Sequence, residues 1–244
     1  EMIAAGYLAN GAKVYISSRK ADVCNATAER LQNEFGGECV SIPADMSNLD
    51  GIQAFVDEFK QHEDHLDILV NNAGVAWGAP LEEFPENGWD KVMDTNVKGV
   101  FFLIQQLLPL LEAGATADDP SRVINIGSID GIKSPAFETY SYGPSKAAVH
   151  ALTRQLGGQL APRNIIVNAI APGPFPTWML STGVGTGGDV EGTDWDGWAK
   201  EMNPSGRVGT PEDIAGLAIY WSSRAGQFTV GEIITCDGGS VVGR

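Results

Sequence analysis

The chain alternates between short apolar runs and longer amphipathic segments. The clearest amphipathic segment covers residues 51–62, where Ile52, Phe55, Val56 and Phe59 repeat at helical spacing. The apolar runs between such segments are short and have no polar face, which is typical of parallel strands that helices cover on both sides. The pattern predicts strands at residues 13–17, 38–42, 66–70, 122–126, 165–170 and 232–236, and helices at 1–10, 22–35, 51–62, 89–111, 143–160 and 211–223.

This alternation predicts one α/β domain over residues 1–244, a doubly wound fold of the Rossmann type around a parallel sheet. Residues 174–206 interrupt the alternation and are rich in Gly, Asp and Trp. A segment of this length and polarity is too small for a second domain, so we expect a substrate lid over a site.

Composition narrows the possible partners. A net charge of −15 argues against nucleic acid or an anionic membrane as the main partner. The three cysteines are widely spaced and match neither a zinc site nor a disulfide framework, so a cytoplasmic protein without a metal is expected. The longest apolar run, residues 100–111, is interrupted by two glutamines and a proline, so no membrane span is predicted.

Ligands of such a sheet bind beyond the carboxyl ends of its strands. The residues that come directly after the predicted strands are mostly small or polar, as a nucleotide crevice requires. This candidate crevice contains Ser18, Arg19, Asp45, Met46, Asn72, Ala73, Gly74, Gly127, Ser128, Pro172 and Gly173.

A tyrosine and a lysine lie four residues apart at the start of one predicted helix. Tyr142 and Lys146 therefore share a helix face. A lysine charge near a phenol lowers the phenol pKa, which makes the tyrosine a proton donor near neutral pH. The alternative is a solvated Tyr and Lys on a helix surface, which is the commoner case for this spacing alone. Tyr140 lies six residues before Lys146 and is expected outside the helix.

Taken in order, the motifs resemble those of the short-chain dehydrogenase/reductases over the whole chain. They are Asn71-Asn72-Ala73-Gly74, Asn96, Ser128, Tyr142-x-x-x-Lys146, Pro172-Gly173 with Thr177, and Asp237-Gly238-Gly239. Within the family, residues 88–93, 105–111 and 142–146 are most similar to NADPH-dependent 3-oxoacyl (β-ketoacyl) reductases, those of rhamnolipid synthesis in particular.

The resemblance implies a role for each matched residue. Tyr142 would be the general acid, Lys146 would lower its pKa and bind the nicotinamide ribose, and Ser128 would hold the substrate carbonyl oxygen. Asn96 would bind a water that links Lys146 to solvent. The cofactor would contact Ser18, Arg19, Asp45, Met46, Asn72, Ala73, Gly74, Tyr142, Lys146, Pro172, Gly173, Phe175 (through its backbone) and Thr177. The alternatives are a turn or cap role for Ser128, a buried structural role for Asn96, a strand-ending turn at residues 72–74 and an ordinary loop role for Thr177.

The choice of cofactor depends on the residues directly after the strand at 13–17. No carboxylate is present there to accept a hydrogen bond from the ribose 2′-hydroxyl of NAD. Arg19 can instead pair with a 2′-phosphate, so NADP(H) is predicted over NAD(H). The alternative is a solvated Arg19-Lys20 pair on a loop. The family's first strand and Gly-rich turn are absent from this sequence, and we expect that about twenty upstream residues are missing rather than that the protein lacks them.

The sequence thus predicts an NADPH-dependent oxidoreductase of carbonyl compounds and secondary alcohols that reduces 3-oxoacyl thioesters. The alternatives are a dehydrogenase of another secondary alcohol (polyol, sugar or steroid) and a non-catalytic binding protein. The aromatic and Met side chains of residues 174–206 suit an acyl chain, or they merely pack the lid on the body. A homotetramer through the helices at 89–111 and 143–160 is expected, and His62, His65 and His150 have no assigned role.

Overall fold

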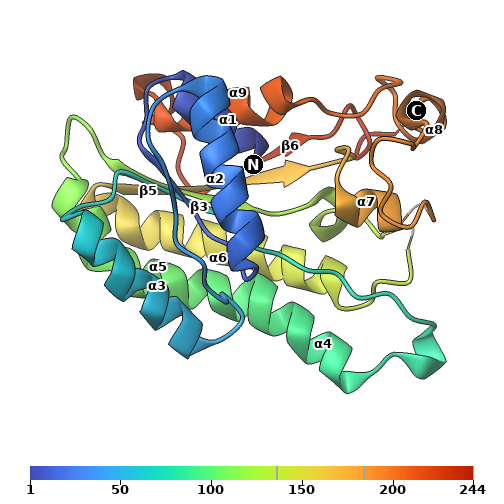
Figure 1. Cartoon of the computed structure of the whole chain (residues 1–244). Coiled ribbons are helices and arrows are strands. Elements are labelled where there is room, and N and C mark those ends of the chain that lie inside the picture. Colours follow the sequence, from blue (N-terminus) through green and yellow to red (C-terminus); the bar gives the residue numbers. More distant parts are fainter. Residues whose placement is uncertain (136, 184, 244) are drawn as a thin grey trace.

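The computed structural model describes residues 1–135, 137–183 and 185–243 (Figure 1). Each predicted strand and helix has a counterpart, and the order is α1 (Met2–Ala9), β1 (Val14–Ile16), α2 (Ala21–Phe35), β2 (Cys39–Ser41), α3 (Leu49–His62), β3 (Ile68–Asn71), α4 (Glu86–Met93), α5 (Gly99–Gly114), β4 (Ser121–Ile126), α6 (Tyr142–Leu160), β5 (Ile165–Pro172), α7 (Trp178–Gly183), α8 (Trp195–Met202), α9 (Pro211–Ser222) and β6 (Ile233–Cys236). The α/β fold class is confirmed.

All paired strands run parallel, as predicted. They form two sheets instead of the single one expected: β1 pairs with β2, and β3, β4, β5 and β6 pair in that order. The reason is that, among the described residues, no strand pairs with both β1 and β3.

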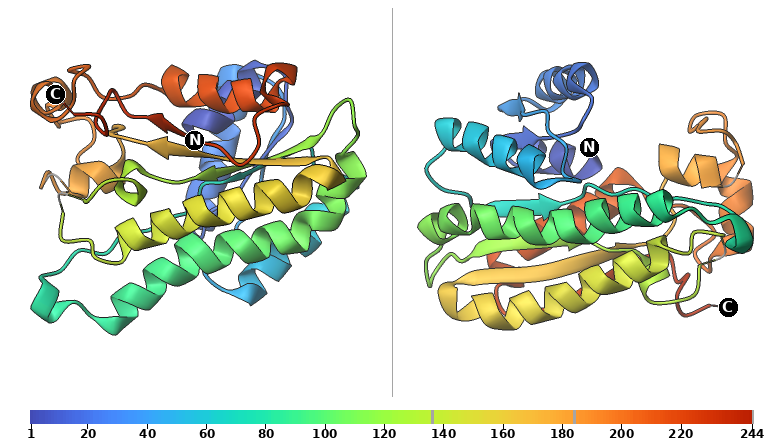
Figure 2. Two further views of the ribbon diagram at one scale, coloured as in Figure 1. Left: turned by 180° about the vertical axis from the view of Figure 1, so that it is seen from behind. Right: turned by 90° about the horizontal axis from the view of Figure 1, so that it is seen from below.

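Helices cover both faces of the sheets (Figures 1 and 2). Successive residues of a strand point to opposite faces of the sheet, so adjacent residues of β4 pack into different hydrophobic clusters. Val123 joins Leu107 of α5 in a cluster that also includes α3, whereas Ile124 joins Trp221 of α9 in a second cluster. The core is therefore built of helix layers on either side of the β3–β6 sheet.

The helix predicted at 89–111 consists of α4 and α5 joined by a π-helical turn at Asp94–Lys98. The stretch Glu86–Gly114 is the one helix in the described part of the chain that is long and apolar enough to cross a membrane, by length and composition only. The sequence argument from interrupted apolar runs did not find it. In this fold Leu103, Ile104 and Leu107 of the stretch are buried in the core, which accounts for much of its apolar content.

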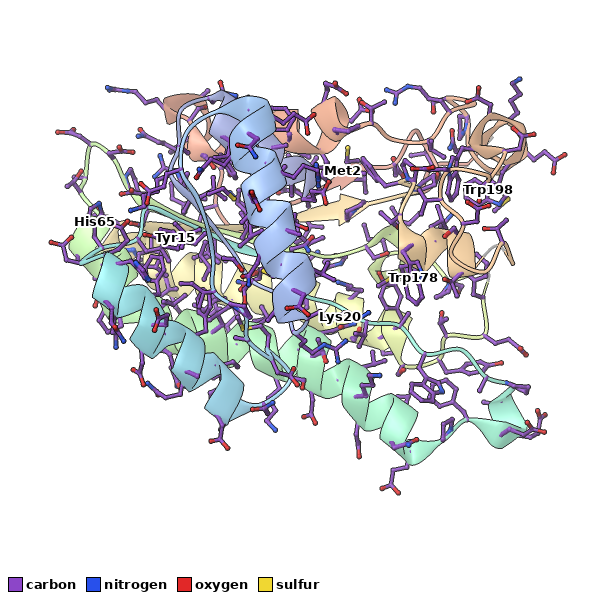
Figure 3. The ribbon with its side chains drawn as sticks, viewed as in Figure 1. Met2, Tyr15, Lys20, His65, Trp178 and Trp198 are labelled. Atoms are coloured by element: carbon purple, nitrogen blue, oxygen red, sulfur yellow. The ribbon has the colours of Figure 1, made fainter. Side chains whose placement is uncertain are left out.

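The segment 174–206 contains two short helices that its composition did not predict. Asp194 begins α8 by accepting a hydrogen bond from the amide of Gly197 at 2.9 Å. Trp195 and Trp198 meet edge to face with ring centroids 6.4 Å apart, and Trp178 on α7 is 68% exposed (Figure 3). Val184 lies outside the described residues. The role of the segment as a lid stays a prediction.

Candidate active site

Tyr142 and Lys146 lie in the first turns of α6. Tyr142 is the first helical residue, and Pro144 lies where helix amides have no intrahelical partner, so the proline does not disturb the helix. Lys146 is only 4% exposed, and its Nζ donates a hydrogen bond to the carbonyl oxygen of Ile126 at 2.8 Å. The same Nζ lies 5.6 Å from the centroid of the Tyr142 ring. Both side chains therefore meet at the carboxyl end of β4.

Burial dominates the electrostatics of this pair. It raises the pKa of Tyr142 to about 12, with a hydrogen bond to Ser128 acting in the opposite direction and the charge of Asp130 adding to the rise. Burial also lowers the pKa of Lys146 to about 8. The expected fall of the phenol pKa is not seen in this structure, because desolvation of the phenol outweighs the hydrogen bond to Ser128. A lowering of that pKa by the charge of Lys146 stays a prediction. At neutral pH the phenol holds its proton and the ammonium is charged.

Ser128 lies at the end of β4 and faces Tyr142. Its Oγ accepts a hydrogen bond from the amide of Asp130 at 3.1 Å, which begins a short 3-10 turn at Ile129–Gly131. The side chain is 7% exposed and also makes a hydrogen bond with Tyr142. Its turn role and its position at the candidate site are therefore both present in the structure.

Asn96 lies in the π-helical turn and is 1% exposed. Its Oδ1 accepts from the amide of Val75 at 2.8 Å, and its Nδ2 donates to the carbonyl of Val75 at 2.9 Å and to Ser145 Oγ at 3.0 Å. Both amide hydrogens are thus used to tie the segment after β3 to α6. This corresponds to the structural alternative, and the water-binding role stays a prediction.

The segment after β3 approaches the lysine closely. A Cβ built on Gly74 would lie 3.5 Å from Lys146 Nζ and 3.5 Å from Asn96 Oδ1. Asn72 and Ala73, between Gly74 and the strand, are exposed and open to a ligand. A residue larger than glycine at position 74 would narrow the space around the lysine.

Behind the site lies a buried chain of polar side chains, of which only Asn71 was named among the sequence motifs. Asn71 donates from Nδ2 to Asn125 Oδ1 at 2.8 Å, and Asn125 donates to Thr153 Oγ1 at 2.9 Å. These bonds join β3, β4 and α6. The sequence signal that could have found Asn125 is a polar residue inside an otherwise apolar strand.

The ends of β1 and β2 carry the residues predicted to choose the cofactor. The amide of Ala44 donates to the carbonyl of Ser18 at 3.1 Å, which holds the two ends together. Arg19 is exposed. Burial acts against ionisation of Asp45, but hydrogen bonds from Ser47 and the charge of Arg19 hold its pKa below the ordinary value. Met46 lies next to Asp45, and its carbonyl is packed against the start of α5.

The residues after β5 lead into the 174–206 segment. A Cβ on Gly173 would lie 2.7 Å from Cα of Asp237, so only glycine fits where these two backbones meet. Pro172 ends β5, whereas the Phe175 side chain is buried in the core, 8% exposed. Thr177 is exposed and begins α7 by accepting from the amide three residues on, at 3.3 Å.

The structure thus brings Asn96, Ser128, Tyr142 and Lys146 together, while Arg19 and Asp45 lie at the separate β1–β2 sheet. In a doubly wound parallel fold, a protonated phenol, a serine that faces it and a buried ammonium that meet at the carboxyl end of a strand define a Rossmann-type oxidoreductase. The chain belongs to the short-chain dehydrogenase/reductase family. A family model described as enoyl-(acyl carrier protein) reductase matches residues 1–241.

Similar proteins support this assignment. The chain is 46% identical over 239 residues to a rhamnolipids biosynthesis 3-oxoacyl-[acyl-carrier-protein] reductase of Pseudomonas aeruginosa, covering 98% of this chain and 90% of the relative. It is 34% identical to a 5-keto-D-gluconate 5-reductase of Escherichia coli, covering 99% and 90%. The fold is similar to an active-site complex of Pseudomonas aeruginosa RhlG with NADP, with a TM-score of 0.90, 45% identity, and 98% and 90% of the two chains covered. It is also similar to an L-sorbose reductase of Gluconobacter frateurii complexed with NADPH and L-sorbose, with a TM-score of 0.85, 26% identity, and 98% and 91% covered. The predicted resemblance is confirmed.

Proposed function

We propose that this protein is an NADPH-dependent reductase of 3-oxoacyl thioesters, with Tyr142 as the general acid. The observation that carries the proposal is the juxtaposition of a protonated Tyr142, the Ser128 hydroxyl that meets it and the charged Lys146. The substrate class is supported by the printed activity of the 46% identical relative.

The chain's own groups would act on the carbonyl oxygen of the substrate. Ser128 and Tyr142 would both donate hydrogen bonds to that oxygen, where negative charge develops. Tyr142 would then transfer its proton, and the phenolate left behind would be stabilised by the ammonium of Lys146. When bound, NADPH supplies the hydride that adds to the carbonyl carbon.

Several features fit a bound NADP(H). Lysine has three N–H donors, and Lys146 Nζ gives one hydrogen bond to Ile126, so the others remain for the ribose hydroxyls. Gly74 leaves room beside that ammonium, and Arg19 is exposed at the end of β1 for a 2′-phosphate. The cofactor named in two similar structures, NADP or NADPH, supports the same choice.

The exposed side chains of the 174–206 segment favour an acyl chain over a polyol. Trp178, Met179 and Met202 are 68%, 38% and 46% exposed, and together they offer apolar surface. A sugar-type carbonyl is the second candidate, because relatives named for 5-keto-D-gluconate and L-sorbose share the fold. We further propose that residues 1–244 form one domain with this segment as its lid.

The proposed homotetramer would form through α4, α5 and α6. A groove of about 580 Å³ lies between these helices. Its lining includes the apolar Phe101, Phe102, Ala148 and Leu152 and the polar Asp94, Lys98 and Gln155. Phe101 is 37% exposed, and burying it against a second copy would be favourable. We propose a cytoplasmic location from the unpaired cysteines, Cys24, Cys39 and Cys236.

The test is oxidation of NADPH by the protein, monitored by the absorbance of NADPH. A 3-oxoacyl thioester and 5-keto-D-gluconate are compared as substrates, and NADH is run in parallel. Wild type should turn over the thioester with NADPH, Tyr142→Phe should be inactive but folded, and Tyr140→Phe should keep its activity. Turnover of 5-keto-D-gluconate alone would overturn the substrate class, and activity of Tyr142→Phe would overturn the mechanism.

A further inference from the structure

A buried histidine lies beside the site without a part in the proposed reaction. His150 is on α6, one turn after Lys146, and is 3% exposed. Burial, together with the charges of Arg154 and Lys146, lowers its pKa to about 4, although a backbone hydrogen bond at Gly131 acts in the opposite direction. The ring is therefore neutral at neutral pH and adds no charge next to Lys146.

The imidazole lies against the two glycines that flank Ser128. A Cβ built on Gly127 would lie 2.7 Å from Cδ2 of His150 and closer still to its Nε2. A Cβ built on Gly131 would lie 2.8 Å from Cε1 of the same ring. Neither glycine has a positive φ, so the need for glycine comes from the close approach and not from the backbone conformation.

The two glycines differ in what they meet. At Gly127 the nearest atoms belong to the His150 side chain, and the next is the carbonyl oxygen of Ile170 at 3.3 Å. At Gly131 the nearest atoms are the carbonyl carbon of Lys146 at 2.7 Å and the amide nitrogen of Ala147 at 2.8 Å, which belong to the helix backbone. The histidine ring therefore separates the start of the Ser128 turn from α6, whereas the end of the turn meets both the ring and the helix backbone.

We propose that His150 is a positioning residue that supports the turn 127–131 and so holds Ser128 Oγ toward Tyr142. His150 touches neither the proposed substrate nor the cofactor and acts through Ser128. Its Nε2 has no hydrogen-bond partner within the described chain, whereas the hydrogen bond with the Gly131 backbone ties the ring to the end of the turn. The inference rests on the proposed function, since the position of Ser128 matters only if Ser128 holds a substrate oxygen.

The contact can be tested by a pair of substitutions that compensate each other. His150→Ala removes the support and should lower kcat about tenfold, while the Kd for NADPH changes less than twofold because Ser128 lies outside the cofactor contacts. Gly127→Ala should lower kcat at least as much, because the new methyl group displaces the turn. In the double variant the methyl group occupies the space left by the ring, so kcat should recover above that of either single variant. His150→Gln, which keeps a neutral side chain of some bulk, should retain more kcat than His150→Ala.

Gly131→Ala provides the matched control. Its methyl group would meet the helix backbone as well as the His150 ring. Adding His150→Ala removes only the ring, so the backbone clash remains and kcat should not be restored. Three results would each overturn the proposal. The first is an unchanged kcat in His150→Ala, and the second is a loss of NADPH binding that parallels the loss of kcat. The third is a kcat of the double variant Gly127→Ala/His150→Ala that does not rise above that of the single variants. Failure of the proposed function gives a different result, because the wild-type protein would then be inactive toward the thioester. In that case the variants are compared on any other carbonyl compound that the wild-type protein reduces. If wild type reduced no carbonyl compound, the positioning role would be refuted as well.

Discussion

Replacing Lys146 with methionine should stabilise the cofactor-free protein while abolishing turnover. The ammonium is buried, and its pKa falls from 10.5 to about 8 on folding. This drop corresponds to a cost of roughly 3 kcal/mol for keeping the lysine charged in the folded state at pH 7. Methionine fills similar space but loses the charge-assisted hydrogen bond to Ile126, which is worth about 2 kcal/mol. The net gain is about 1 kcal/mol, or roughly 3 °C in Tm for a domain of this size.

The gain in stability of Lys146→Met over wild type should become smaller as the pH rises. Below about pH 8 the lysine is protonated in both states, so wild type bears the full cost. Between pH 8 and 10.5 the unfolded chain keeps a proton that the folded chain has released, so the stability of wild type rises with pH relative to the variant. Above that range only the lost hydrogen bond remains, and wild type should be the more stable protein.

The measurement is urea unfolding of both proteins at a series of pH values, with activity assayed on the same samples. Lys98→Met is the control, because Lys98 is an exposed lysine paired with Asp94 and should contribute little. A Lys146→Met variant that is less stable than wild type at pH 7, or a difference that stays constant from pH 8 to 10, would refute the reasoning. Either result would mean that burial does not dominate the energetics of this lysine.

Other contacts support three further predictions. Asn96→Ala loses three hydrogen bonds and should lower the free energy of unfolding by about 3 kcal/mol in urea titrations. Ser145→Ala loses two and should lower it by about 2 kcal/mol, and a larger loss in Ser145→Ala would contradict the structural role of Asn96. Arg19→Glu should weaken NADPH binding about tenfold and spare NADH in fluorescence titrations, and equal losses would exclude a 2′-phosphate contact. Phe101→Asp should reduce the mass measured by light scattering with little change in Tm, and an unchanged mass would place the interface elsewhere.

The sequence predicted most of the elements because their periodicity is local. The segment at 51–62 needed only its own apolar positions, and the structure has α3 there. The π-helical turn at Asp94–Lys98 was not predicted, because no residue type marks the place where one extra residue enters a helix. The separation of β1–β2 from the other strands was also missed, since pairing depends on contacts between distant segments.

The site divides in the same way. Tyr142, Lys146 and Ser128 could be named from local spacing and resemblance, and the structure brings them together. The direction in which the Tyr142 pKa shifts could not be predicted from the sequence, because burial depends on everything packed around the phenol. His150 was left unassigned, although it shares a helix face with Lys146, because its contact with Gly127 joins residues far apart in the chain.

The π-helical turn also has a consequence for how the chain tolerates insertions and deletions. An α-helical residue advances the helix by about 100°, so one extra residue in the turn sets the angular phase of α4 relative to α5. Deleting any one residue between Asp94 and Lys98 would restore a regular helix but rotate α4 by about that angle against its neighbours. Val92, fully buried on α4, would then turn away from the core. At this point the length of the chain, and not only its composition, specifies which side chains face inward.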